Sequence, residues 1–168
     1  RDGLTALSVR NGAAEAGLPP SSLRYTFPTQ ASVRDRAVAL LVERLAVRVA
    51  RHRDASHAGA GEARAILHEL LPLDAERRME MEVSLGLGAM AATDPALWAA
   101  HRELHGAVRD ACAQAAELLG AGDGETAAVH AFVDGLALHL VRQESDAGDA
   151  WAIDALDAYL RRLELSGE

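Results

Sequence analysis

The stretch "AAEAGLPPSSLRYTFPTQ" (residues 13–30) decides how the start of the chain is organised. A helix with Ser8 as its N-cap has Gly17 where a left-handed C-cap is favoured, and a tight turn follows. Pro20 suits the first turn of a second short helix, because the N–H that proline lacks has no helical partner there. The second helix must end before Pro28. The spacing therefore predicts a helix-turn-helix within the first thirty residues.

The charge of the chain is unevenly distributed around this stretch. Residues 1–53 carry 9 Arg and 4 acidic residues, a net charge of +5, whereas residues 54–168 carry 8 Arg and 21 acidic residues, a net charge of −13. A basic head on an acidic body favours contact between the head and a polyanion. The alternative is a chance clustering of arginines on a solvated helix.

The composition predicts an all-α protein. Of the 168 residues, 49% are hydrophobic but only 4% are aromatic, so the core must be aliphatic and alanine-rich, which favours close-packed helices. A continuous apolar run of about 18 residues is absent, so no membrane partner is expected. The single Cys112 cannot form an internal disulfide, which is consistent with a cytoplasmic location.

Apolar periodicity predicts a long helix over residues 31–52 and further helices toward the C-terminus. The segment 78–90, "RMEMEVSLGLGAM", is ambiguous because its apolar residues alternate as in a strand. A helix is preferred there, since a lone strand would have no partner for its backbone. The remaining predicted helices cover approximately residues 62–71, 95–119, 125–144 and 149–165.

The residues "LSVRNGAAEAGLPPSSLRYTFPTQASV" (residues 7–33) resemble the DNA-binding signature of TetR-type transcriptional regulators. That signature reads Ser/Thr-Val-Arg, then Ala-Ala-Glu-Ala-Gly-Val, a short polar helix and Tyr-x-Phe. The segments "DPALW" and "FVDGLAL" are similar to the helical body of the same family. The resemblance implies a helix-turn-helix domain over residues 1–45, expected to lack its first helix, and a helical effector-binding and dimerisation bundle over residues 46–168.

The resemblance also implies a DNA-reading role for the second short helix. Small hydroxyl side chains let such a helix approach the major groove closely, and arginine and tyrosine reach bases or phosphates. Gly12 and Gln30 depart from the family pattern, which has a branched apolar residue and a lysine there. The predicted DNA-binding residues are Ser8, Arg10, Pro20, Ser21, Ser22, Arg24, Tyr25, Thr26 and Gln30.

The body is expected to bind a small-molecule effector and to form a homodimer. His101 and His105 stand one helical turn apart, but no cysteine or carboxylate of matching spacing completes a metal-ligand set, so neither a metal nor a cofactor is expected. Ordinary core packing is the alternative for each apolar residue. The predicted effector pocket comprises Leu67, Met79, Met90, Trp98, His101, His105, Phe132 and Val133. The predicted dimer interface comprises Val129, Phe132, Leu136, Leu140, Trp151, Ala155, Leu156 and Tyr159.

The function implied is that of a sequence-specific regulator, most simply a repressor that an effector releases from a palindromic double-stranded operator. Binding of the effector would shift the long helix over residues 31–52 and change the spacing of the two reading heads. An enzyme is not expected, because nucleophile-elbow, phosphate-loop and His-Glu metal motifs are lacking. The alternative is a helical ligand-binding or scaffold protein whose DNA-binding head has decayed.

Overall fold

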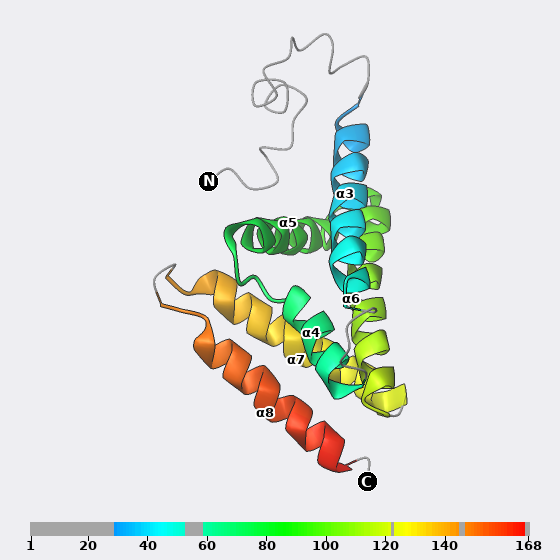
Figure 1. Ribbon diagram of the computed structural model, residues 1–168. Coiled ribbons are helices and arrows are strands. Elements are labelled where there is room, and N and C mark those ends of the chain that lie inside the picture. The colour runs from blue at the N-terminus through cyan, green and yellow to red at the C-terminus, as the bar shows by residue number, and fades with distance from the viewer. Residues whose placement is uncertain (1–28, 53–58, 122, 145–146, 167–168) are drawn as a thin grey trace.

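The computed structural model describes residues 29–52, 59–121, 123–144 and 147–166, and every regular element in these ranges is a helix (Figure 1). The all-α prediction is confirmed. None of the helices in the described ranges combines the length and the apolar character that crossing a bilayer needs. The elements are α3 (Gln30–Ala50), α4 (Ala60–Glu69), α5 (Ala75–Ala91), the short 3-10 helix η2 (Pro95–Leu97), α6 (Trp98–Leu118), α7 (Asp123–Arg142) and α8 (Ala150–Ser166).

The long helix α3 begins at a capping box. The backbone N–H of Ser32 donates to Thr29 Oγ1 over 3.0 Å, and the N–H of Thr29 donates to Ser32 Oγ over 3.2 Å. Two backbone donors that a helix start leaves unsatisfied thus gain partners. The two short helices predicted for the head lie outside the described residues.

The ambiguous segment folds as helix α5, as preferred from the sequence. Asp74 caps it by accepting the Arg77 backbone N–H at 2.8 Å. The apolar residues of this segment are buried to different extents, since Met79 is 50% exposed while Leu87 is only 1% exposed. A strand would have placed both side chains on one face.

Helix α6 is the central element, since it packs against α3, α4, α5 and α7. Figure 1 shows α3 beside α6, with α5 running crosswise to them. At the other end of the molecule α7 and α8 lie side by side, and α8 also packs against α4.

The buried side chains form two separate groups, and α3 contributes to both. The α5 cluster lies between the first half of α3, α5, η2 and the start of α6. It consists of Val38, Leu41, Leu87, Ala91, Leu97, Ala100 and Leu104. The larger group, the body core, consists of Leu45, Val49, Ala63, Ile66, Leu67, Leu71, Ala111, Cys112, Ala115, Val129, Val133, Leu136, Ala137, Leu140, Ala152, Leu156 and Leu160.

Candidate functional site

A cavity of about 430 Å³ opens between α5, α6 and α7. Its walls are mainly apolar, with three histidines and one serine as further polar groups, and Asp134 is the one side chain lining it that carries a formal charge when the histidines are neutral. Gly88 allows α5 to lie close to α6, since a Cβ at Gly88 would stand 3.3 Å from Cε1 of His101. The lining residues are Leu70, Met81, Ser84, Leu85, Gly88, Ala89, His101, His105, Val108, His130, Val133, Asp134, Gly135, Ala137 and Leu138.

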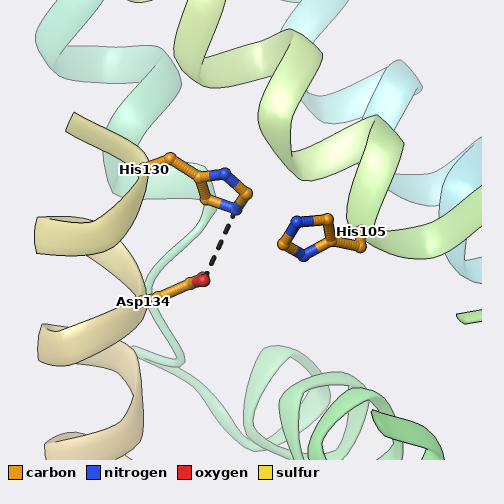
Figure 2. Close-up of side chains that lie close together, drawn as sticks. All are labelled: His105, His130 and Asp134. Atoms are coloured by element: carbon orange, nitrogen blue, oxygen red, sulfur yellow. Dashed lines mark ion pairs between the residues drawn. The ribbon is translucent and has the colours of Figure 1, made fainter. Parts of the chain in front are cut away.

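A row of aromatic rings leads from the surface into this cavity. Trp98 meets His101 edge-on with ring centroids 5.6 Å apart, and His101 is 5.7 Å from His105. The row then crosses from α6 to α7, because the ring of His105 lies 4.7 Å from that of His130 at an interplanar angle of 38°. The two rings face each other from different helices (Figure 2).

His130 is the most enclosed polar group of the row. Its side chain is 10% exposed, and its Nε2 atom is buried without a hydrogen-bond partner among the described residues. The nearest anionic group is Asp134 one turn further along α7, whose Oδ2 lies 3.5 Å from that nitrogen (Figure 2). A buried polar atom without a partner costs about 1–3 kcal/mol. This end of the cavity is therefore suited to a polar or charged guest.

Cys112 lies in the body core and takes no part in the cavity wall. Burial, together with the nearby negative charge of Asp134, raises the pKa of its thiol to about 12. A thiol with that pKa remains protonated at neutral pH, so Cys112 lacks the thiolate that redox or metal chemistry requires.

A second, smaller cavity of about 60 Å³ lies next to the first and reaches α3. The two cavities share the wall residues Leu70, Met81, Ser84 and Val108. Three α5 and α6 side chains thus border both spaces, and a change in their packing on one side is felt on the other.

A network of ion pairs lines the smaller cavity and connects α3 to α4 and α5. Arg48 on α3 places Nη2 2.8 Å from Glu80 Oε2 on α5, and its Nε lies 3.3 Å from Glu69 Oε2 on α4. Arg44, one turn earlier, contacts Glu76 at 2.9 Å. The Arg48 and Glu80 side chains are only 18% and 11% exposed, so solvent screens this pair weakly. The pair therefore couples the position of α3 to that of α5.

The predicted DNA-binding residues lie almost entirely outside the described residues. Only Gln30 is described, as the exposed first residue of α3. The others are Ser8, Arg10, Pro20, Ser21, Ser22, Arg24, Tyr25 and Thr26.

Three of the eight predicted pocket residues, His101, His105 and Val133, line the large cavity. The other five lie outside its wall. Leu67 is fully buried in the body core, and Phe132 stacks on Tyr159 with centroids 4.3 Å apart. Met79, Met90 and Trp98 point outward, with 45–50% of each residue exposed. Helical spacing identified apolar positions but did not distinguish which neighbour each face meets.

The residues of the predicted dimer interface fall into two groups by their exposure within the protomer. Val129, Leu136, Leu140 and Leu156 are at most 7% exposed and belong to the body core of the protomer itself, so they have no surface to offer a partner. These residues form the faces with which α7 and α8 bury themselves against the rest of the bundle. The predicted residues that retain exposed surface are Phe132, Trp151, Ala155 and Tyr159.

Sequence reasoning missed His130 and Asp134 in the cavity and Arg48 and Glu80 at the helix junction. The spacing of His130 and Asp134, four residues apart on one helix, was visible in the sequence. The residues between them are apolar, which favoured an interpretation of α7 as a purely buried helix. That His105 faces them from α6 depends on the tertiary structure.

One family model matches the chain. The family model for the C-terminal domain of BetI-type transcriptional repressors matches residues 59–164. Among curated proteins, none is detectably similar in sequence.

Several solved structures resemble the chain along most of its length. A transcriptional regulator from Rhodococcus sp. Rha1 is 27% identical, with a TM-score of 0.77 over 95% of this chain and 86% of that one. The multidrug binding protein EbrR, solved with imidazole, is 26% identical, with a TM-score of 0.58 over 93% of this chain and 82% of that one.

A proposed transcriptional regulator from Saccharomonospora viridis, solved with choline, has a TM-score of 0.76 over 96% of this chain and 88% of that one, and at 15% identity it shows the fold alone. The family match spans more than half of the chain and includes all the residues of the large cavity. The chain therefore belongs to the TetR family of transcriptional regulators, and its C-terminal part is a domain of the BetI type.

Proposed function

We propose that this regulator is a DNA-binding repressor, and that an effector bound in the large cavity releases it from its operator. The observation that carries this proposal is the position of α5. Ser84 and Gly88 of α5 line the cavity, whereas Glu80, one turn earlier, holds Arg48 of α3. Helix α3 lies within the basic segment of residues 1–53 and follows the predicted helix-turn-helix in the sequence. A guest that moves α5 therefore moves α3, and with it the reading head.

The charge of the cavity wall indicates which effectors fit. Asp134 is the one formal charge in the wall, and no arginine lines the space, so an anionic effector would lack a counter-ion. A neutral or cationic molecule with an apolar part fits both the wall and the volume of about 430 Å³. The regulator from Saccharomonospora viridis was solved with choline, a cationic ligand, which supports this class.

DNA binding is tested by fluorescence anisotropy with the region upstream of the protein's own gene. The affinity should fall steeply as salt rises, because neutralised phosphates release counter-ions. Arg24→Ala, in the predicted reading helix, should lower the affinity, whereas Arg161→Ala on the exposed side of α8 serves as a control. Weak binding of the wild type without salt dependence would favour a ligand-binding protein with a decayed head.

Release is tested by first screening neutral and cationic molecules, choline included, for a rise in melting temperature. Each molecule that stabilises the protein is then added to the protein–DNA complex. The wild type should lose DNA affinity, and Glu80→Gln should respond less because the link between α5 and α3 is weakened. The matched control is Glu82→Gln on the same helix, where the carboxylate is 57% exposed. Equal responses of all three proteins would refute transmission through α5.

We also propose that the exposed faces of α7 and α8 form the dimer interface. Ala128 and Ala131 of α7 are exposed next to the half-buried stack of Phe132 and Tyr159. Small side chains there allow a second helix to approach closely. Ala131→Arg should convert a dimer into a monomer in sedimentation experiments, whereas Ala99→Arg on the exposed face of α6 should not.

A further inference from the structure

We infer that His105, His130 and Asp134 form a binding site for one divalent transition-metal ion at the wall of the large cavity. The inference goes beyond the proposed function, because this site would exist even if the chain bound no DNA. It rests on the convergence of three ligand types from two helices, α6 and α7 (Figure 2).

The geometry of the three side chains is close to that of a metal site. One ligand atom from each residue lies within 4.8 Å of the other two. Ligand atoms on a tetrahedral ion with bonds of about 2.0–2.1 Å stand about 3.3 Å apart. The distance of 3.5 Å between His130 Nε2 and Asp134 Oδ2 already matches this spacing. His105 must move by about 1.5 Å at most to reach the same spacing, and its side chain is exposed and able to rotate.

An unsatisfied nitrogen points to the same ligand. His130 Nε2 is buried, has no hydrogen-bond partner among the described residues, and faces the anionic oxygen of Asp134. A metal ion between these two atoms gives the nitrogen a bond and neutralises the carboxylate. A positive ion also agrees with a wall whose one formal charge is negative.

The donor set selects the class of metal. Two imidazoles and one carboxylate favour Zn²⁺, Co²⁺ or Ni²⁺ over Ca²⁺ and Mg²⁺, which prefer oxygen ligands alone. Cys112 is not one of the converging ligands, because it lies in the body core and not in the cavity wall. Three protein ligands leave at least one coordination position open, and the cavity beside them has room for a water molecule there.

The experiment uses tag-free protein, stripped of metal with a chelator and titrated with Zn²⁺ by calorimetry and with Co²⁺ by visible absorption. We expect one ion per protomer and a Co²⁺ spectrum of nitrogen and oxygen coordination. His105→Asn and Asp134→Asn should each weaken binding by about tenfold or more. Both side chains lie at the open side of the site, so these variants should fold, as circular dichroism would verify.

The matched control is His139→Asn, which removes an exposed histidine from the same helix and should bind Zn²⁺ like the wild type. Imidazole ¹⁵N resonances of His105 and His130 should shift together at one equivalent of Zn²⁺. An unchanged affinity in either His105→Asn or Asp134→Asn, or equal weakening in His139→Asn, would overturn the site. None of these measurements involves DNA, so their failure and a failure of operator binding are separate results.

Discussion

The body core and the α5 cluster are both aliphatic and both include side chains of α3, but they are stabilised in different ways. The body core joins α3, α4, α6, α7 and α8 through 17 buried residues. The α5 cluster has 7 buried residues, borders the smaller cavity through Leu41 and Leu104, and relies on ion pairs such as Arg48–Glu80 to hold α5 to α3. The many buried contacts of the larger group preserve its shape, whereas the smaller cluster has fewer contacts to lose when it rearranges. We therefore expect α5 to be less firmly held in the body than α7 and α8.

The largest loss of stability is expected for a substitution in the body core. Leu156→Ala removes a fully buried side chain of α8 and should lower the free energy of unfolding by about 2–5 kcal/mol. Leu40→Ala on α3, where 37% of the residue is exposed, is the control and should cost much less. Urea denaturation followed by circular dichroism measures both. Equal losses would mean that the body core is not the main source of stability.

A smaller loss is expected in the α5 cluster. Leu87 is 1% exposed, but it belongs to a smaller cluster than Leu156 does, and that cluster borders the smaller cavity through Leu41 and Leu104, which leaves room to relax after truncation. Leu87→Ala should therefore lower the free energy of unfolding by about 2 kcal/mol, the low end for such substitutions. Hydrogen exchange should show α5 amides opening before those of α4 and α7. Slower exchange in α5 than in α7 would contradict the comparison.

The next prediction concerns the ion pair between Arg48 and Glu80 and its contribution to the free energy of unfolding. Glu80→Gln removes one charge of the Arg48 pair and leaves Arg48 with only Glu69, so we expect a loss of about 1–3 kcal/mol. The same substitution at Glu82, which is 57% exposed and 3.8 Å from Arg78, should change the stability by less than about 0.5 kcal/mol. The melting temperatures of the two variants, measured under the same conditions, test this difference. A neutral result for Glu80→Gln would show that packing alone holds α3 to α5.

The smallest effect concerns the pH dependence of the α4–α8 contact. Burial, with the positive charge of Arg64, lowers the pKa of His68 from its ordinary value of 6.5. The unfolded chain therefore binds a proton near pH 6.5 where the folded chain does not, so this residue makes stability fall as the pH drops through that value. In His68→Gln, the difference in melting temperature between pH 7.5 and pH 5.5 should be smaller than in the wild type. A difference as large as that of the wild type would refute the lowered pKa.

Asp157 on α8 makes the stability of the protein depend on pH in a lower range. Hydrogen bonds from Arg64, one of them 2.7 Å long, lower the pKa of Asp157 below its usual 3.8. The contribution of a carboxylate with a depressed pKa is present above pH 4 and is lost only as the pH falls through the folded value. The window from pH 7.5 to pH 5.5 therefore isolates His68 from Asp157.

The sequence alone determined the secondary structure of the body well, because helices and their ends depend on local chemistry. Apolar spacing marked each helix, and Asp94 followed by Pro95 marked the start of the helix predicted to run to residue 119, which the structure divides into η2 and α6. The predicted helix over residues 31–52 was observed as Gln30–Ala50. The predicted boundary between residues 45 and 46 falls inside this continuous helix, and the family match begins later, at residue 59.

Only the tertiary structure decided which side chains meet. Val129 and Phe132 were equally plausible interface residues by spacing, yet Val129 is buried in the body core while Phe132 stacks on Tyr159 nearer the surface. His105 and His130 are 25 positions apart, and their rings face each other only because α6 and α7 pack together. A helical period of 3.6 residues specifies a direction around one axis, but the neighbour found in that direction depends on how all the helices pack at once.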